Sequence, residues 1–104
     1  MDLSQYRSNS LNRYSAKRSI HAHNFTFYAP DAKQISIIGD FNQWDSSVNQ
    51  MTPQPGGYWS AQVLLHHGHH RYQFLVDGVP TLDPKAQGIV RNDKNERASL
   101  IAIS

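Results

Sequence analysis

Apolar and polar residues alternate in short runs along this chain, and residues that favour turns separate the runs. The alternation is clearest in residues 58–65 and 71–76. Because a strand directs successive side chains to opposite faces, each run predicts a strand with one buried face. The side chains expected to face the core are those of Trp59, Ala61, Val63, Leu65, Tyr72, Phe74 and Val76.

Further runs, before and after residues 58–76, also favour strands. Residues 24–28 alternate and place Phe25 and Phe27 on one face, and residues 34–38 are short and rich in β-branched side chains. Residues 79–82 and 99–103 complete a set of six or seven short strands. Residues 23–104 contain no sustained helical period, so the pattern predicts an all-β, antiparallel sandwich of the immunoglobulin-like type.

The connections between these runs carry signals of their own. Asp77-Gly78 is a strong hairpin signal, because both residues tolerate a positive φ. The run His66-His-Gly-His-His70 is a polar break around a glycine and predicts a hairpin loop between its flanking strands. We expect residues 41–57 to be irregular and residues 85–97, in which basic and acidic side chains are mixed, to form a solvated loop.

Charge divides the chain into two parts. Residues 1–23 hold four basic residues and one acidic residue, whereas residues 24–104 hold six basic and seven acidic residues. The net charge of +2 therefore comes from the first part, and the folded part lacks the basic face expected of a nucleic-acid-binding domain. We predict a flexible, basic leader over residues 1–22 and one folded domain over residues 23–104.

Length and composition exclude several other classes. A chain of 104 residues suits one domain, and the absence of cysteine excludes disulfides, thiolate metal sites and cysteine nucleophiles. No apolar run approaches the ~18 residues that span a membrane, and the N-terminus lacks the pattern of a secretion signal. The composition favours a cytoplasmic protein.

Four motifs follow one another in a specific order: Ile38-Gly-Asp-Phe-Asn-Gln-Trp44, Gly57-Tyr-Trp59, His70-Arg-Tyr-Gln-Phe-Leu-Val-Asp-Gly78 and Leu82-Asp-Pro84. Through them, residues 25–103 resemble the family 48 carbohydrate-binding modules. These include the glycogen-binding domain of the AMP-activated protein kinase β subunit and the N-terminal early-set domains of isoamylases and branching enzymes. One motif alone would be weak, but four in this order and spacing are specific.

The resemblance implies an early-set, immunoglobulin-like β-sandwich that binds α-1,4-linked glucans such as glycogen or starch, without catalytic activity of its own. It also implies action beside a glucan-metabolising enzyme or a kinase. Glycogen-binding members of the family use a second tryptophan after the Val-Asp-Gly turn, a lysine before that turn and an asparagine before the last strand. This chain has Pro80, Gln73 and Ala98 at those places, and it retains Trp44.

The physical chemistry of sugar binding favours the same residue. A pyranose ring has an apolar face of C–H groups, which an exposed tryptophan ring covers well. Trp44 lies in a segment rich in Asn, Gln, Asp and Ser, where exposure is expected. We therefore predict Trp44 as a stacking platform, with Asn42 and Gln73 as hydrogen-bonding partners of sugar hydroxyls. The alternative is that Trp44 caps the end of the sandwich.

Other candidate chemistry in the chain is weaker. Asp40 and Asp45 flank the Trp44 segment as turn-stabilising residues and have no partner for acid–base catalysis, so we expect no catalytic residue. The four histidines of residues 66–70 would alternate between faces, so we expect neither a metal site nor a cofactor. A second functional hypothesis is a protein-interaction domain that kept this fold and lost the sugar.

Overall fold

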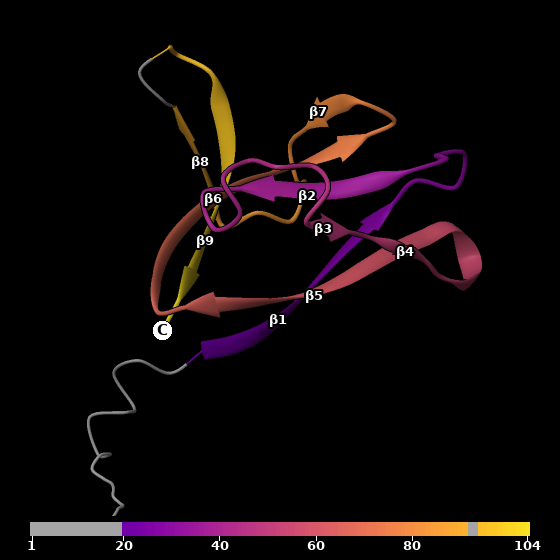
Figure 1. Ribbon diagram of the computed structural model, residues 1–104. Coiled ribbons are helices and arrows are strands. Elements are labelled where there is room, and N and C mark those ends of the chain that lie inside the picture. Colours follow the sequence, from indigo (N-terminus) through magenta and orange to yellow (C-terminus); the bar gives the residue numbers. More distant parts are fainter. Residues whose placement is uncertain (1–19, 92–93) are drawn as a thin grey trace, which may run out of the picture.

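The computed structural model describes residues 20–91 and 94–104, which form an antiparallel, immunoglobulin-like β-sandwich (Figure 1). One sheet has the strand order β1-β5-β4, and the other has the order β3-β2-β6-β9-β8, with β7 paired to β6. The strands are β1 (Ile20–Tyr28), β2 (Ile35–Gly39), β3 (Asn49–Gln50), β4 (Thr52–Pro53), β5 (Tyr58–His66), β6 (Gly68–Val76), β7 (Val79–Thr81), β8 (Gly88–Arg91) and β9 (Arg97–Ile103), and a short 3₁₀ helix covers Pro55–Gly57.

The core between the sheets confirms the inward faces predicted from the alternation. Trp59, Tyr72 and Phe74 are all buried, and the indole N–H of Trp59 donates to the Ala29 carbonyl over 2.9 Å. Phe25 is buried as well and lies edge-on to Tyr72, with ring centroids 4.9 Å apart. The buried apolar residues that pack together are Phe25, Ile35, Ile37, Met51, Trp59, Val63, Leu65, Tyr72, Phe74, Ile101 and Ile103.

The hairpin predicted at Asp77-Gly78 is confirmed. Val76 pairs with Val79 across the turn, and both turn residues have positive φ, 48° at Asp77 and 85° at Gly78. The Asp77 carboxylate also accepts the backbone N–H groups of Lys33 and Gln34. The turn therefore anchors the segment that leads into β2.

The hairpin predicted at residues 66–70 is wrong. β5 extends through His66 and β6 begins at Gly68, but the two strands belong to different sheets. Gly68, with φ of 122°, turns the chain from one sheet to the other, and His69 and His70 pair with β9 instead of forming a loop. A polar break marks where a strand ends, but it carries no information about which sheet the next strand joins.

The structure contains strands that the alternation did not predict. β3 and β4 have two residues each and lie within the stretch expected to be irregular. β8 is an edge strand that pairs with β9 and lies within the expected solvated loop, so that expectation is wrong over Gly88–Arg91. β1 begins at Ile20, within the stretch assigned to the leader, while residues 1–19 lie outside the described part of the chain.

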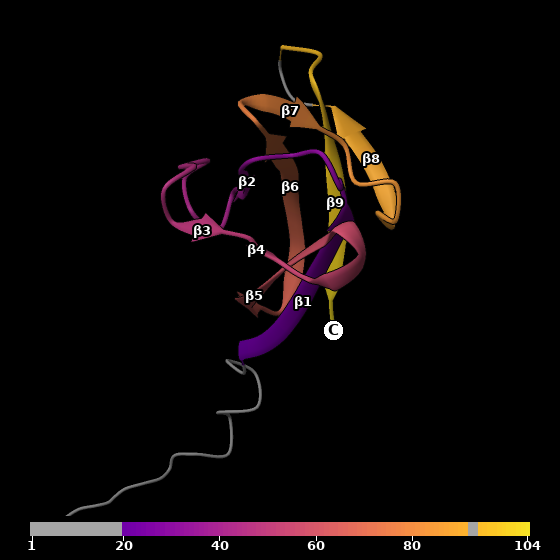
Figure 2. The same ribbon diagram turned by 90° about the vertical axis from the view of Figure 1, so that its right-hand side faces the viewer.

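Two connections bring loops to the outer face of the larger sheet. The β2–β3 connection, residues 40–48, projects from the sheet in Figure 2. The β6–β7 hairpin lies on the same sheet, because β7 pairs with β6. None of the described residues forms a helix long and apolar enough to cross a membrane.

Candidate functional site

The β2–β3 loop is built around the buried side chain of Asn42, which is 4% exposed. Its amide oxygen accepts the backbone N–H of Gly39 over 3.0 Å. Its amide nitrogen donates to the Ile37 carbonyl over 2.9 Å and to Oδ1 of Asn49 over 2.8 Å. Asn42 thus ties both ends of the loop together.

This framework holds Trp44 in a left-handed backbone conformation. Gln43 has φ of 56° and Trp44 has φ of 59°, and each such residue costs about 1–2 kcal/mol when it is not glycine. The backbone N–H of Trp44 donates to the Gly39 carbonyl over 2.9 Å, which keeps the turn closed. The indole ring of Trp44 is 43% exposed, so it does not pack into the core.

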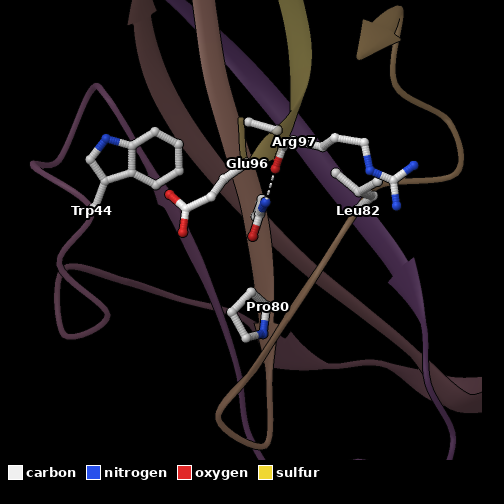
Figure 3. A pocket seen from close by; sticks show the side chains of 7 residues that line it. Trp44, Pro80, Leu82, Glu96 and Arg97 are labelled. Carbon is white, nitrogen blue, oxygen red and sulfur yellow. Dashed lines mark hydrogen bonds between the residues drawn. The ribbon is translucent and has the colours of Figure 1, made fainter. Parts of the chain in front are cut away.

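Trp44 stands at the edge of an open cavity of about 550 Å³ on the outer face of the larger sheet. Figure 3 shows the indole at one side, Leu82 and Arg97 at the other, and Pro80 at the lower edge. The lining residues are Trp44, Gln73, Pro80, Leu82, Glu96, Arg97 and Ala98. Apolar surfaces and groups of both charges therefore face one hollow.

Gln73 reaches the cavity from β6, where its neighbours Tyr72 and Phe74 point into the core. Its amide nitrogen donates to the Arg97 carbonyl, a hydrogen bond drawn as a dashed line in Figure 3. This bond fixes the orientation of the amide and leaves its oxygen as an acceptor toward the cavity.

Four residues that the sequence analysis considered individually lie together at the cavity. Trp44, Gln73, Pro80 and Ala98 come from the β2–β3 loop, β6, β7 and β9, and all four line it. Asn42 does not line it, and its amide groups are engaged inside the loop. The structure therefore assigns Asn42 a positioning role behind Trp44.

The sequence model of carbohydrate-binding module 48 (isoamylase N-terminal domain) matches residues 13–87. The chain belongs to this family. Curated relatives of the chain include 1,4-alpha-glucan branching enzymes, of which that of Rhizobium johnstonii is 35% identical over 85 residues, covering 77% of this chain and 12% of the relative. That of Marinobacter nauticus is 37% identical over 77 residues, covering 68% of this chain and 12% of the relative. The chain thus matches about an eighth of the length of these proteins.

The charged residues near the module's Trp44 loop have structural partners. One oxygen of Asp45 accepts both the hydroxyl and the backbone N–H of Ser47, and these hydrogen bonds lower the pKa of Asp45. Asp45 therefore stabilises the turn, as predicted from the sequence. Asp40 accepts the backbone N–H of Arg71 over 3.0 Å and lies 3.4 Å from Nδ1 of His70.

A buried tyrosine–carboxylate pair supports the far wall of the cavity. The hydroxyl of Tyr72 donates to Asp83 over 2.6 Å, and the backbone N–H of Asp83 donates to the hydroxyl of Ser99 over 2.8 Å. Burial raises the pKa of Tyr72 far above its ordinary value, and the hydrogen bond to Asp83 adds to this. These contacts fix the segment that begins at Leu82 against the sandwich.

The histidines of residues 66–70 do not gather into a metal site in the part of the chain described. No group of three His, Cys, Asp or Glu side chains lies there at distances suited to a metal ion. His70 instead contacts the His66 carbonyl through Nε2 over 2.8 Å.

Three lining residues, Leu82, Glu96 and Arg97, were not predicted as part of the site. In the sequence, Leu82 belongs to a predicted strand and to the Leu-Asp-Pro motif, whereas Glu96 and Arg97 belong to a predicted solvated loop. The alternation along β9 gives no signal for Arg97, because Arg97 shares its side of the strand with the buried residues Ser99, Ile101 and Ile103. Their convergence depends on β9 lying beside β6, which is a property of the folded sheet.

Proposed function

We propose that this module binds α-1,4-linked glucans of the glycogen and starch type and has no catalytic activity of its own. One observation carries the proposal: the half-exposed indole of Trp44 stands over an open cavity that also holds Gln73 and Pro80. A sugar ring that stacks on the indole would leave its hydroxyl groups facing the polar side chains of the cavity.

The expected affinity is low. Covering ~100 Å² of apolar surface contributes about 2.5 kcal/mol, at ~25 cal/mol per Å². Millimolar binding needs about 4 kcal/mol, so hydrogen bonds must supply the remainder. Gln73 offers a neutral partner and Arg97 a charged one, and a hydrogen bond to a charged group contributes about 1.5–3 kcal/mol. One tryptophan with one such bond gives about 4–5.5 kcal/mol, which accounts for millimolar to submillimolar binding of a short glucan.

The family relatives suggest where such binding is used. They are named 1,4-alpha-glucan branching enzymes, and the matched part is a small fraction of each. The module would accordingly hold a glucan beside an enzyme that acts on it. This role needs no metal or cofactor from the module.

Electrophoresis through gels that contain glycogen tests this function. The wild type should migrate more slowly with glycogen than without it, and Trp44→Ala should lose most of this retardation. Tyr58→Ala is a matched control, because Tyr58 is 50% exposed but lies on β5 in the opposite sheet. Equal migration of the wild type with and without glycogen would contradict the proposal and favour the protein-interaction alternative.

A further inference from the structure

A second, smaller hollow adjoins the cavity on the same sheet. It has a volume of about 230 Å³ and is lined by Asp40, Trp44, Arg71, Val90 and Ala98. Trp44 and Ala98 line both hollows, so the indole stands between them. A molecule that contacts Trp44 can therefore extend to either side of it.

The two hollows lie along one face of β6. Tyr72 and Phe74 point into the core, so Arg71 and Gln73 point to the outer face. Gln73 lines the larger hollow and Arg71 the smaller one, about 7 Å apart along the strand. On the neighbouring strands, Val90 of β8 pairs with Ala98 of β9, and these small side chains form the floor.

The polar groups of the smaller hollow are held in place by the backbone. Asp40 accepts the N–H of Arg71 over 3.0 Å, while its own N–H donates to the Arg71 carbonyl over 3.0 Å. Nδ1 of His70 lies 3.4 Å from the other carboxylate oxygen. Within residues 20–91 and 94–104, no hydrogen bond or salt bridge engages the guanidinium of Arg71. A fixed acceptor and an available donor thus stand beside the apolar surfaces of Trp44 and Val90.

This combination suits a neutral, polyhydroxylated ring. Adjacent hydroxyl groups donate to a carboxylate and accept from a guanidinium, while the C–H face of the ring meets apolar side chains. An anionic ligand fits less well, because Asp40 lies next to Arg71 and Glu96 next to Arg97.

We propose that the hollow formed by Asp40, Arg71 and Val90 is a second glucosyl subsite, which binds the part of an α-glucan that continues past Trp44. The subsite rests on the proposed function, since the same chain must first occupy the larger cavity. It makes the module selective for longer glucans. A short glucan fills one side of Trp44, and a longer one contacts Arg71 as well.

Calorimetric titration with maltotriose and maltoheptaose tests the subsite. We expect the wild type to bind maltoheptaose about tenfold more tightly than maltotriose. Arg71→Ala should lower the maltoheptaose affinity about tenfold, as for the loss of a charge-assisted hydrogen bond, and leave maltotriose binding unchanged. Asp40→Asn keeps an acceptor for the Arg71 N–H and should show the same loss in weaker form. Lys33→Ala, which removes an exposed cation outside both hollows, should behave as the wild type.

The outcomes separate the two proposals. If the wild type binds both sugars equally, or if Arg71→Ala weakens both equally or neither, the second subsite is overturned and the glucan-binding function stands. If the wild type binds neither sugar, both proposals are overturned. Thermal unfolding of each variant verifies that a lost affinity does not come from a lost fold.

Discussion

Replacing Asn42 with alanine removes a side chain that lies behind the cavity but organises the loop that carries Trp44. The substitution takes away the acceptor of the Gly39 N–H and the donor to the Ile37 carbonyl. Gly39 and Ile37 are both buried, so water has little access to either group. A buried backbone group without a partner costs about 1–3 kcal/mol.

The two lost partners together predict a fall of about 2–6 kcal/mol in the free energy of unfolding. This is a large share of the 5–15 kcal/mol that stabilises a typical domain. The bond to Asn49 adds less, because it is only partly buried. Glucan affinity should also fall, since Gln43 and Trp44 keep their left-handed backbone only while the loop is closed.

Urea unfolding followed by circular dichroism measures the effect. Asn24→Ala is the matched control, because Asn24 is exposed and only a long contact of 3.4 Å joins it to Gln62. The control should stay within about 0.5 kcal/mol of the wild type. A loss below about 1 kcal/mol for Asn42→Ala, or a loss equal to that of the control, would refute the argument that this amide holds the loop.

Three further predictions follow from single contacts. Tyr72→Phe should cost about 1–3 kcal/mol near neutral pH, because Asp83 loses its donor. The pKa of Tyr72 is raised from 10.0 in the fold, so the unfolded chain loses this proton first and stability falls as the pH rises above about 10. In urea titrations over this pH range, the free energy of unfolding of Tyr72→Phe should fall less steeply than that of the wild type. Pro80→Trp should tighten maltoheptaose binding about 30-fold in calorimetry, because it adds a second stacking face worth about 2 kcal/mol across the cavity from Trp44. Gly39→Ala should lower the melting temperature strongly, because a Cβ there would lie 2.6 Å from the Arg71 carbonyl oxygen, while Gly88→Ala, with 3.6 Å to Leu100, should be tolerated.

The fold was predictable where the signal is local. Alternation in β5 and β6 identified Trp59, Tyr72 and Phe74 as core residues, because a strand's period of two is visible within one run. The Asp77-Gly78 hairpin was predictable for the same reason, since its turn depends on two adjacent residues. The corner at Gly68 was not predictable, because it depends on which sheet offers β6 its partners.

The candidate site was predictable only in part. The motif around Trp44 indicated an exposed aromatic residue, and the structure places its ring half-exposed over a cavity. The motif could not reveal that the Asn42 amide forms hydrogen bonds with the backbone of the loop, because an asparagine amide can bind a backbone group or a ligand equally well. Glu96 and Arg97 join the site only because β9 pairs with β6. Convergence of distant strands is a property of the tertiary structure.

The two tryptophans of the chain provide the most direct test of glucan binding at this cavity. Trp44 is half-exposed at the rim, whereas Trp59 is buried and donates its indole N–H to Ala29. In a ¹H–¹⁵N nuclear magnetic resonance titration with maltoheptaose, the indole signal of Trp44 should shift progressively and saturate in the millimolar range or below. The signal of Trp59 should stay in place. An unchanged Trp44 signal at saturating sugar, or equal shifts of both indoles, would contradict binding through Trp44.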